Sequence, residues 1–309
     1  MENWWLKMIW VHCAALRYML CILPQTGYIF PDEFFQSPEI MAGDLLDIAS
    51  YRTWEWDSSK PARNIVFPLV SSGIPYMVMR YLSGIFGSQN IITPYTLLLG
   101  PRLWMTTLSF VVDYLIYRLA VKCYNGNTVV ADVAVNLFAT SYTCWVFCTR
   151  TFSNTAELLL LAILLNLVVI PIGKEHNVKN IFDMNAKATL VALTTMAAFF
   201  IRTSFIAFAL FPIGMWVFQN VSFSNNPREM VDTFLRVFAL YPGFVIAAVG
   251  FAFCDGIYFN HNSTQMFPLN SLSLHNVSRW ITELPWTPIN ILKYNFNDSL
   301  LEQHGKHPY

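Results

Sequence analysis

Two adjacent carboxylates stand in an aromatic-rich segment near the start of the chain. Asp32 and Glu33 follow a proline in the string Pro24-Gln-Thr-Gly-Tyr-Ile-Phe-Pro-Asp-Glu-Phe-Phe-Gln36. A reaction that transfers a group to a hydroxyl needs a carboxylate within hydrogen-bonding reach of the proton it removes, so this pair predicts a general base. The alternative is a helix start, with Asp32 as the N-cap and Glu33 in the first turn. Both interpretations can hold together.

Two arginines at the ends of apolar segments are candidates for binding an anion. Arg150 lies in Cys-Thr-Arg-Thr-Phe-Ser-Asn-Thr and Arg202 in Phe-Ile-Arg-Thr-Ser-Phe, so hydroxyl side chains neighbour both. Charges at such depths are costly and commonly functional, and a guanidinium binds phosphate oxygens in a bidentate fork. We therefore predict contacts with a lipid phosphate. The alternatives are ion pairs with Glu157 or Asp113, or extension toward the membrane interface.

Three other polar residues lie in or beside apolar segments. Asp113 follows Arg102 by eleven residues, about three helical turns, which places both on one helical face. A polar contact between helices is the predicted role of Asp113. Asp255 and Tyr258 follow the last long apolar segment, where contact with a substrate and a simple end-capping role are alternatives.

The composition predicts a membrane protein. Of 309 residues, 55% are hydrophobic and 12% are charged, whereas about a quarter of the residues in a soluble domain are charged. So few charges cannot coat a globule of this size. The net charge of zero argues against a large basic groove for nucleic acid. The six cysteines show no CxxC spacing, so the sequence signals neither a disulfide framework nor a zinc site.

A spanning helix needs about 20 mainly apolar residues. Seven segments approach this pattern, namely 4–23, 95–121, 128–148, 155–172, 187–201, 203–219 and 233–253. A cleaved signal peptide is the alternative for the first, although its tryptophans favour an anchor. The fifth and sixth are short and meet at Arg202, so one broken span is their alternative.

The distribution of basic residues predicts the orientation. The basic residues of the short loops fall on one side if the N-terminus is cytoplasmic, namely Lys122, Lys174, Lys179, Lys187 and Arg228. Segments 24–94, 149–154 and 254–309 then face the lumen. Three N-glycosylation patterns in the last segment agree, beginning at Asn262, Asn276 and Asn297, whereas a fourth at Asn220 falls on the cytoplasmic side.

The long first loop, 24–94, carries two further patterns. From Phe34 onward, apolar residues through Ile48 occupy one helical face and polar residues, including Gln36 and Asp47, the other, which predicts an interfacial helix. The segment from Ile65 to Phe86 is apolar but interrupted by proline and glycine. It is expected to lie on the membrane surface or re-enter it, with an eighth span as the alternative.

No Walker A, GxGxxG, HExxH or GxSxG pattern appears in a supporting context. Nucleotide sugars must be imported to reach the lumen. A membrane enzyme that lacks a nucleotide-binding signature, and whose carboxylates face the lumen, would therefore draw its sugar from a lipid carrier.

The Pro-Asp-Glu core resembles the first lumenal loop of glycosyltransferase family 22, and the longer string around it resembles the branch that adds the fourth mannose to GPI anchors. Further matches extend over the whole chain, namely Gly100-Pro-Arg-Leu, Thr149-Arg-Thr-Phe-Ser-Asn-Thr, Phe200-Ile-Arg-Thr-Ser-Phe, Asp255 with Tyr258, Thr287-Pro-Ile-Asn-Ile-Leu-Lys-Tyr-Asn, and His304-Gly-Lys-His-Pro-Tyr309.

The resemblance implies a single all-α GT-C domain over 1–309, embedded among the lipids of the endoplasmic reticulum membrane. It implies transfer of mannose from dolichyl phosphate mannose, with inversion and in α-1,2 linkage, to the third mannose of a GPI precursor. Asp32 would be the base, Glu33 its supporting carboxylate, and Arg150 and Arg202 the ligands of the donor phosphate. Substrate contacts are expected at Gln36, Asp255, Tyr258, His304 and His307. The family's chemistry implies no cofactor and no metal.

Two departures from the family pattern are visible. Phe30 stands where the family usually has histidine, and members continue with more spans after the His-Pro-Tyr motif, so the chain is expected to be incomplete at its C-terminus. Three alternatives stay open: a family 22 enzyme with another mannose acceptor, a lipid transporter or scramblase, and a catalytically inactive partner protein.

Overall fold

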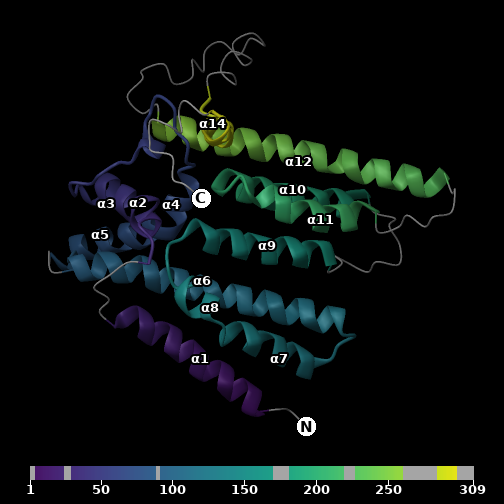
Figure 1. Ribbon diagram of the computed structural model, residues 1–309, viewed down its shortest axis with the longest axis horizontal. Helices are drawn as coiled ribbons and strands as arrows, with labels where there is room; N and C mark the ends of the chain where they lie inside the picture. Colours follow the sequence, from purple (N-terminus) through teal and green to yellow (C-terminus); the bar gives the residue numbers. More distant parts are fainter. Residues whose placement is uncertain are drawn as a thin grey trace.

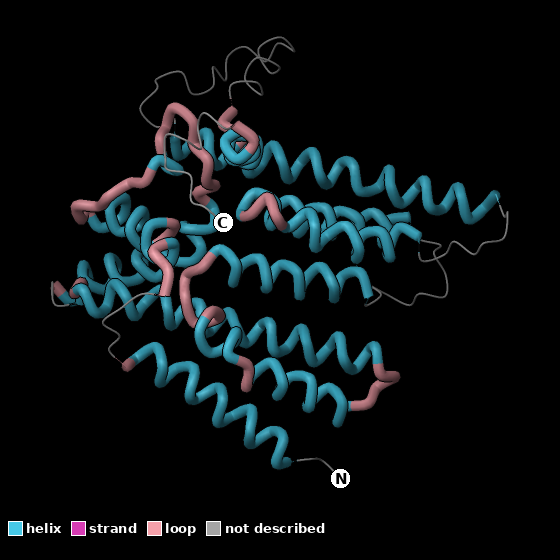
Figure 2. The backbone as a smooth tube through the Cα atoms, in the orientation of Figure 1, coloured by secondary structure: helices cyan, strands magenta, loops and turns pink. Residues whose placement is uncertain are grey.

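The computed structural model describes residues 4–23, 29–87, 91–169, 181–218, 227–259 and 284–297. Within these ranges all regular structure is helical, which confirms the predicted all-α class. The longer helices lie side by side in a bundle (Figures 1 and 2). They are α1 Trp4–Ile22, α6 Pro94–Cys123, α7 Thr128–Ala139, α9 Ser153–Val169, α10 Ile181–Ile201, α11 Phe205–Phe218 and α12 Pro227–Phe259.

Successive helices of the bundle alternate in direction. The segments that contain the predicted site residues therefore lie together at one end of the bundle (Figure 1). The short helices of the first loop gather at this end, namely α2 Asp32–Phe35, α3 Pro38–Leu46, η1 Trp54–Trp56, α4 Val66–Pro68, the π-turn η2 Leu69–Gly73 and α5 Ile74–Phe86. The turns at 149–152 and 202–204 and helix α14 Thr287–Asn295 join them. The 124–127 turn lies at the opposite end.

Helices occur at all seven predicted positions, but their lengths differ. In the described part of the chain, Trp4–Ile22 and Thr233–Phe259 are long and apolar enough to cross a membrane. Four others are apolar and shorter, namely Thr128–Ala139, Ser153–Val169, Asn185–Ile201 and Phe205–Phe218. The helical bundle is thus consistent with a membrane protein, and the count of seven spans stays a prediction.

The segment 128–148 is not one helix, contrary to expectation. Helix α7 ends at Ala139, and the short helix α8, Tyr142–Val146, follows. The break is stabilised by Ser141, whose hydroxyl accepts a hydrogen bond from the backbone of Cys144 and donates one of 2.7 Å to the backbone of Phe138. By contrast, 187–201 and 203–219 form two separate antiparallel helices, so the broken-span alternative is wrong.

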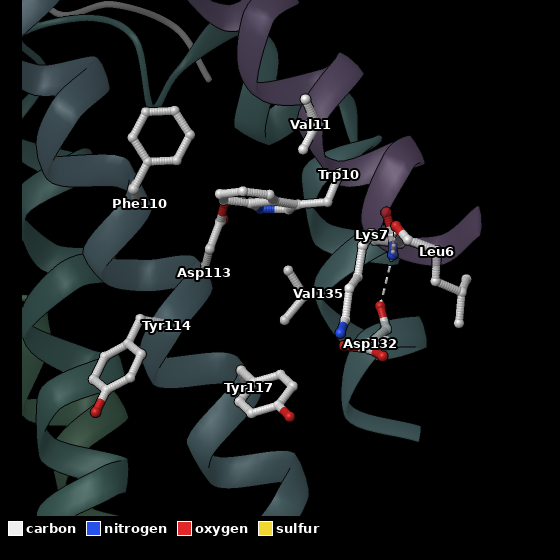
Figure 3. A pocket seen from close by; sticks show the side chains of 11 residues that line it. Leu6, Lys7, Trp10, Val11, Phe110, Asp113, Tyr114, Tyr117, Asp132 and Val135 are labelled. Atoms are coloured by element: carbon white, nitrogen blue, oxygen red, sulfur yellow. Dashed lines mark hydrogen bonds between the residues drawn. The ribbon is translucent and has the colours of Figure 1, made fainter. Parts of the chain in front are cut away.

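A buried ion pair joins α1 to α6. Arg17 is fully buried and lies 3.0 Å from the carboxylate of Asp113, while its guanidinium also donates to Ser109. The indole of Trp10 donates to the same carboxylate at 2.8 Å, and Figure 3 shows the two side chains meeting between the helices. The predicted helix-to-helix role of Asp113 is therefore confirmed, with Arg17 as its partner.

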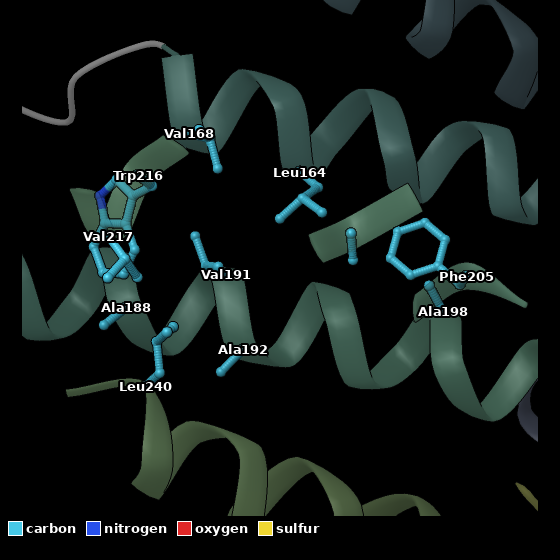
Figure 4. Packing of buried hydrophobic residues seen from close by; sticks show 11 residues of the cluster. Leu164, Val168, Ala188, Val191, Ala192, Ala198, Phe205, Trp216, Val217 and Leu240 are labelled. Carbon is cyan, nitrogen blue, oxygen red and sulfur yellow. The ribbon is translucent and has the colours of Figure 1, made fainter. Parts of the chain in front are cut away.

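The other half of the bundle packs around an apolar cluster. Leu164, Val191, Phe205 and Trp216 belong to one buried cluster that joins α9, α10, α11 and α12 (Figure 4). Helices α10 and α12 approach so closely that a Cβ at Gly243 would lie 2.7 Å from the Cβ of Ala192. Small residues at such crossings are typical of helices that associate in membranes, where dispersion contacts drive packing.

The first loop differs from the predicted two-faced helix. Helix α2 ends before Ser37, α3 begins at Pro38, and Asp47 adopts a left-handed conformation with φ of 55° that ends α3. Gln36, expected on the polar face, is buried. The segment from Val66 to Phe86 is helical throughout, with a π-turn at Leu69–Gly73 between its two prolines.

We expect removal of one partner of the buried pair to lower stability. Arg17→Met leaves Asp113 without its counterion, and such losses cost about 3–5 kcal/mol. Thermal unfolding of the purified protein in detergent should show a clear fall in Tm, while Arg17→Met combined with Asp113→Leu should recover most of it. Lys60→Met, which removes an exposed cation of the first loop, is the control. An unchanged Tm in Arg17→Met would contradict the assignment.

Candidate active site

Glu33 is held between two arginines that come from different parts of the chain. Its side chain is 1% exposed. One carboxylate oxygen lies 2.8 Å from Nε of Arg102 on α6, and the other lies 2.7 Å from a terminal nitrogen of Arg150 in the turn after α8. Charge-assisted hydrogen bonds of this length are among the stronger ones in proteins. Both oxygens of Glu33 are therefore committed to structural partners.

Asp32 has the opposite environment. Pro31 occupies the N-cap position of α2, and Asp32 is the first helical residue, with no side-chain capping bond. The interpretation of Asp32 as the N-cap is thus wrong, although both acids do lie in the first turn. The Asp32 side chain is exposed and makes no hydrogen bond or ion pair with the described residues. Two neighbouring carboxylates therefore differ sharply in burial.

Hydroxyl groups of the 149–153 segment form hydrogen bonds with α2 and the residue that follows it. Thr151 donates a hydrogen bond of 2.8 Å to the backbone carbonyl of Glu33, and Ser153 donates one of 3.3 Å to the side chain of Gln36. Ser153 in turn accepts from a terminal nitrogen of Arg202 at 3.1 Å. Contacts therefore continue from α2 to the turn between α10 and α11, and they connect four of the predicted site residues, namely Glu33, Gln36, Arg150 and Arg202.

Arg202 has a carboxylate partner of its own. Its Nε lies 3.2 Å from Glu157, and Ser204 donates to the other oxygen of that carboxylate at 3.1 Å. It also bonds to the side chain of Asn154. The alternative pairing of Arg202 with Glu157 is confirmed, and the guanidinium side chain is still 30% exposed. The pairing of Arg150 with Glu33 was not among the predicted alternatives.

Asp255 lies apart from this network and is fully buried. One carboxylate oxygen accepts from the side chain of Asn64 and the backbone of Ile65, each at 2.9 Å, and the other accepts from Thr287 at 2.8 Å. The carboxylate thus links the end of α12 to the first loop and to α14. In this conformation no part of it faces solvent.

Tyr258 is one turn beyond Asp255 and also contacts the first loop. Its hydroxyl donates to Asp44 at 2.6 Å, and Arg52, which pairs with Asp44, lies over its ring. Phe30 is 60% exposed near Asp32. His304 and His307 lie outside the described residues, as do Asn220, Asn262 and Asn276, while Asn297 is exposed.

Arg102 is the site residue that the sequence reasoning missed. The sequence places Arg102 on the same helical face as Asp113, but it assigns no contact or role to Arg102. The available signal was its position near the start of a 30-residue, largely apolar helix, where an arginine requires a counter-charge. The sequence alone did not say which acid would supply it.

A family model for Alg9-like mannosyltransferases matches residues 8–309. The chain belongs to the Alg9-like mannosyltransferase family. It is 35% identical over 97% of its length to GPI alpha-1,2-mannosyltransferase 4 of Homo sapiens, and 28% identical over 96% to GPI mannosyltransferase 4 of Drosophila melanogaster. It is 27% identical over 62% of its length to GPI alpha-1,2-mannosyltransferase 3 of Danio rerio.

The chain spans about half the length of these mannosyltransferase 4 relatives, at 48% of the human protein and 45% of the Drosophila protein. No solved structure matches the chain. The family assignment thus agrees with the resemblance found in the first loop, and the sequence similarity extends over almost the whole chain.

The two adjacent carboxylates should respond differently to neutralisation. Glu33→Gln leaves two arginines without their shared counterion, so the Tm in detergent should fall, with a cost of about 3–5 kcal/mol. Asp32→Asn removes an exposed charge and should leave the Tm within a degree or two of wild type, since surface changes stay within about 0.5 kcal/mol. Equal Tm values for the two variants would contradict the assigned environments.

Proposed function

We propose that the chain carries the catalytic residues of a mannosyltransferase that adds the fourth mannose to a GPI anchor precursor. The donor is dolichyl phosphate mannose, and the product is an α-1,2 linkage on the third mannose. The similarity to mannosyltransferase 4 relatives over 97% and 96% of the chain supports this acceptor, because the mannosyltransferase 3 relative aligns over only 62%.

The contrast between Asp32 and Glu33 is the observation that carries the proposal. A general base must accept a proton from its substrate, which requires an accessible oxygen. Both oxygens of Glu33 bond to arginines in a buried site, whereas the Asp32 side chain is exposed. Asp32 is therefore the base, and Glu33 holds the turn that presents it.

The chemistry follows from these roles. Asp32 takes the proton from the 2-hydroxyl of the acceptor mannose while that oxygen forms a bond to the anomeric carbon of the donor. The bond from that carbon to the phosphate oxygen breaks, and dolichyl phosphate leaves with the electron pair. Attack from the face opposite the phosphate inverts the configuration. The phosphate leaves readily, so no general acid is assigned and no metal is required.

Arg202 is the better placed of the two arginines for the donor phosphate. Its side chain is partly exposed, and contacts through Ser153 and Gln36 connect it to the helix that carries Asp32. Arg150 is assigned to the supporting site because one of its terminal nitrogens bonds to Glu33. In this proposal the end of the bundle that holds both residues faces the lumen of the endoplasmic reticulum.

The decisive activity test compares wild type with Asp32→Asn in microsomes that lack the endogenous enzyme. With dolichyl phosphate mannose and a three-mannose GPI precursor, wild type should form product and Asp32→Asn should lose at least about 100-fold, the usual range for a general base. Asp57→Asn is the matched control, because Asp57 is an exposed first-loop acid whose side chain accepts hydrogen bonds from Ser59, outside the candidate site.

The outcomes separate the alternatives. Product only from a two-mannose precursor would favour the sister activity that adds the third mannose. Equal product from wild type and Asp32→Asn would remove Asp32 as the base, and no product from wild type with any acceptor would contradict the enzymatic proposal for this chain.

The orientation has its own test. A variant that keeps Asn262, Asn276 and Asn297 but carries Asn220→Gln should receive endoglycosidase H-sensitive glycans in microsomes. A variant that keeps only Asn220 should receive none. Glycosylation at Asn220 alone would reverse the proposed orientation and place Asp32 on the cytoplasmic side.

A further inference from the structure

Two adjoining cavities lie toward the end of the bundle that is remote from the candidate active site. The first, of about 460 Å³, lies between α1, α6 and α7 and is lined mainly by apolar and aromatic side chains, including Trp10, Val11, Phe110 and Val135. Figure 3 shows residues of α1 facing α6 and α7 across this groove. Neither cavity contains a residue of the candidate active site.

The second cavity, of about 700 Å³, continues the first toward the end of α6. Tyr114 and Tyr117 line both, so the two spaces meet at these rings. The outer cavity is bounded by two exposed cations, Arg118 and Lys122, and none of its described lining residues is acidic. The guanidinium of Arg118 lies 5.7 Å from the ring of Tyr114, a geometry that holds the cation beside the junction.

The acids near the groove do not cancel this charge. Asp113 lines the inner cavity but is paired with Arg17. Asp132 also lines the inner cavity, where the side chain of Lys7 from α1 lies beside it and offsets its charge (Figure 3). The outer opening is therefore cationic, and the space behind it is apolar.

We propose that these two cavities form a binding site for one anionic phospholipid. An acyl chain occupies the groove between α1, α6 and α7, and the phosphate headgroup rests against Arg118 and Lys122. A purely apolar groove would accept any lipid tail, and two surface cations alone would attract any anion. Tyr114 and Tyr117 line both cavities, so the apolar groove leads directly to the two cations. A phospholipid has the same arrangement, with an acyl chain attached to a charged headgroup.

The position of the site agrees with this ligand. Arg118 and Lys122 follow Arg102 by 16 and 20 residues on one helix, which corresponds to about 24 to 30 Å at 1.5 Å per residue. The proposed headgroup site is therefore distinct from the site proposed for the phosphate of the dolichyl donor. In the orientation proposed above, this end faces the cytoplasm, where anionic lipids concentrate and attract basic side chains beside spans.

Native mass spectrometry of the purified chain provides the test, with phosphatidylserine and phosphatidylcholine of identical acyl chains as the probes. Wild type should retain one phosphatidylserine in preference to phosphatidylcholine. Arg118→Gln with Lys122→Gln should weaken phosphatidylserine retention on the order of tenfold, since each cation near an anionic headgroup contributes to binding. Phosphatidylcholine retention should not change.

Two further variants make the test specific. Val11→Trp fills the apolar groove from a position that is 49% exposed, so it should weaken retention of the lipid while preserving the helical circular dichroism signal. Lys60→Gln with Lys293→Gln removes the same charge from exposed positions at the other end and should have no effect.

Three results would overturn the proposal. One is equal phosphatidylserine retention in wild type and the Arg118 and Lys122 double variant. Another is retention unchanged by Val11→Trp, which would reduce the site to surface charge. The third is displacement of the lipid by soluble glycerophosphoserine at equal concentration, which would show an anion site without a lipid groove. Each readout is lipid binding, so it is independent of the mannosyltransferase proposal.

Discussion

The geometry of the candidate active site depends on one buried carboxylate. Glu33 binds Arg102 of α6 and Arg150 of the turn before α9, so a helix of only four residues is tied to two distant parts of the bundle. A single-turn helix has no stability of its own, because nucleation costs more than one hydrogen bond returns. The ion pairs and the hydrogen bond from Thr151 therefore determine where α2 lies, and with it the position of Asp32.

The same constraint accounts for two further arginines. A charge in an apolar environment is costly unless it is paired. Buried Arg17 and partly exposed Arg202 each have an oppositely charged partner, at 3.0 and 3.2 Å. The pairs differ in what they connect. The contact between Arg17 and Asp113 joins two long helices within the bundle, whereas the contacts of Glu33 and Arg202 join loops at its end. Arginine–carboxylate pairs thus both hold the bundle together and position the loops of the candidate site.

Sequence reasoning predicted the elements better than it predicted their partners. Apolar length identified the positions of the seven longer helical segments, and the paired acids of the first loop identified the candidate site. The break at Ser141 was missed, because side-chain bonds to the backbone interrupt a helix without any change in hydrophobicity. The partner of Arg150 was missed because Glu33 lies 117 residues away, and no local pattern encodes a contact of that separation. Gln36 was placed on the wrong face because the helix was assumed to continue through Ser37, where it breaks.

Adjacent residues with the same functional group can therefore divide one task. If both carboxylates were exposed, nothing would hold the turn that carries them, and in the proposed reaction the acceptor hydroxyl would meet a mobile base. If both were buried, neither oxygen pair would reach a substrate. The single turn of α2 resolves this conflict, because consecutive helical residues point about 100° apart. Glu33 turns into the bundle and meets two arginines, and Asp32 consequently turns outward from a backbone that its neighbour holds still. In the proposed reaction, pre-organisation of this kind would let Asp32 act as a base from a loop with the precision expected of a rigid element.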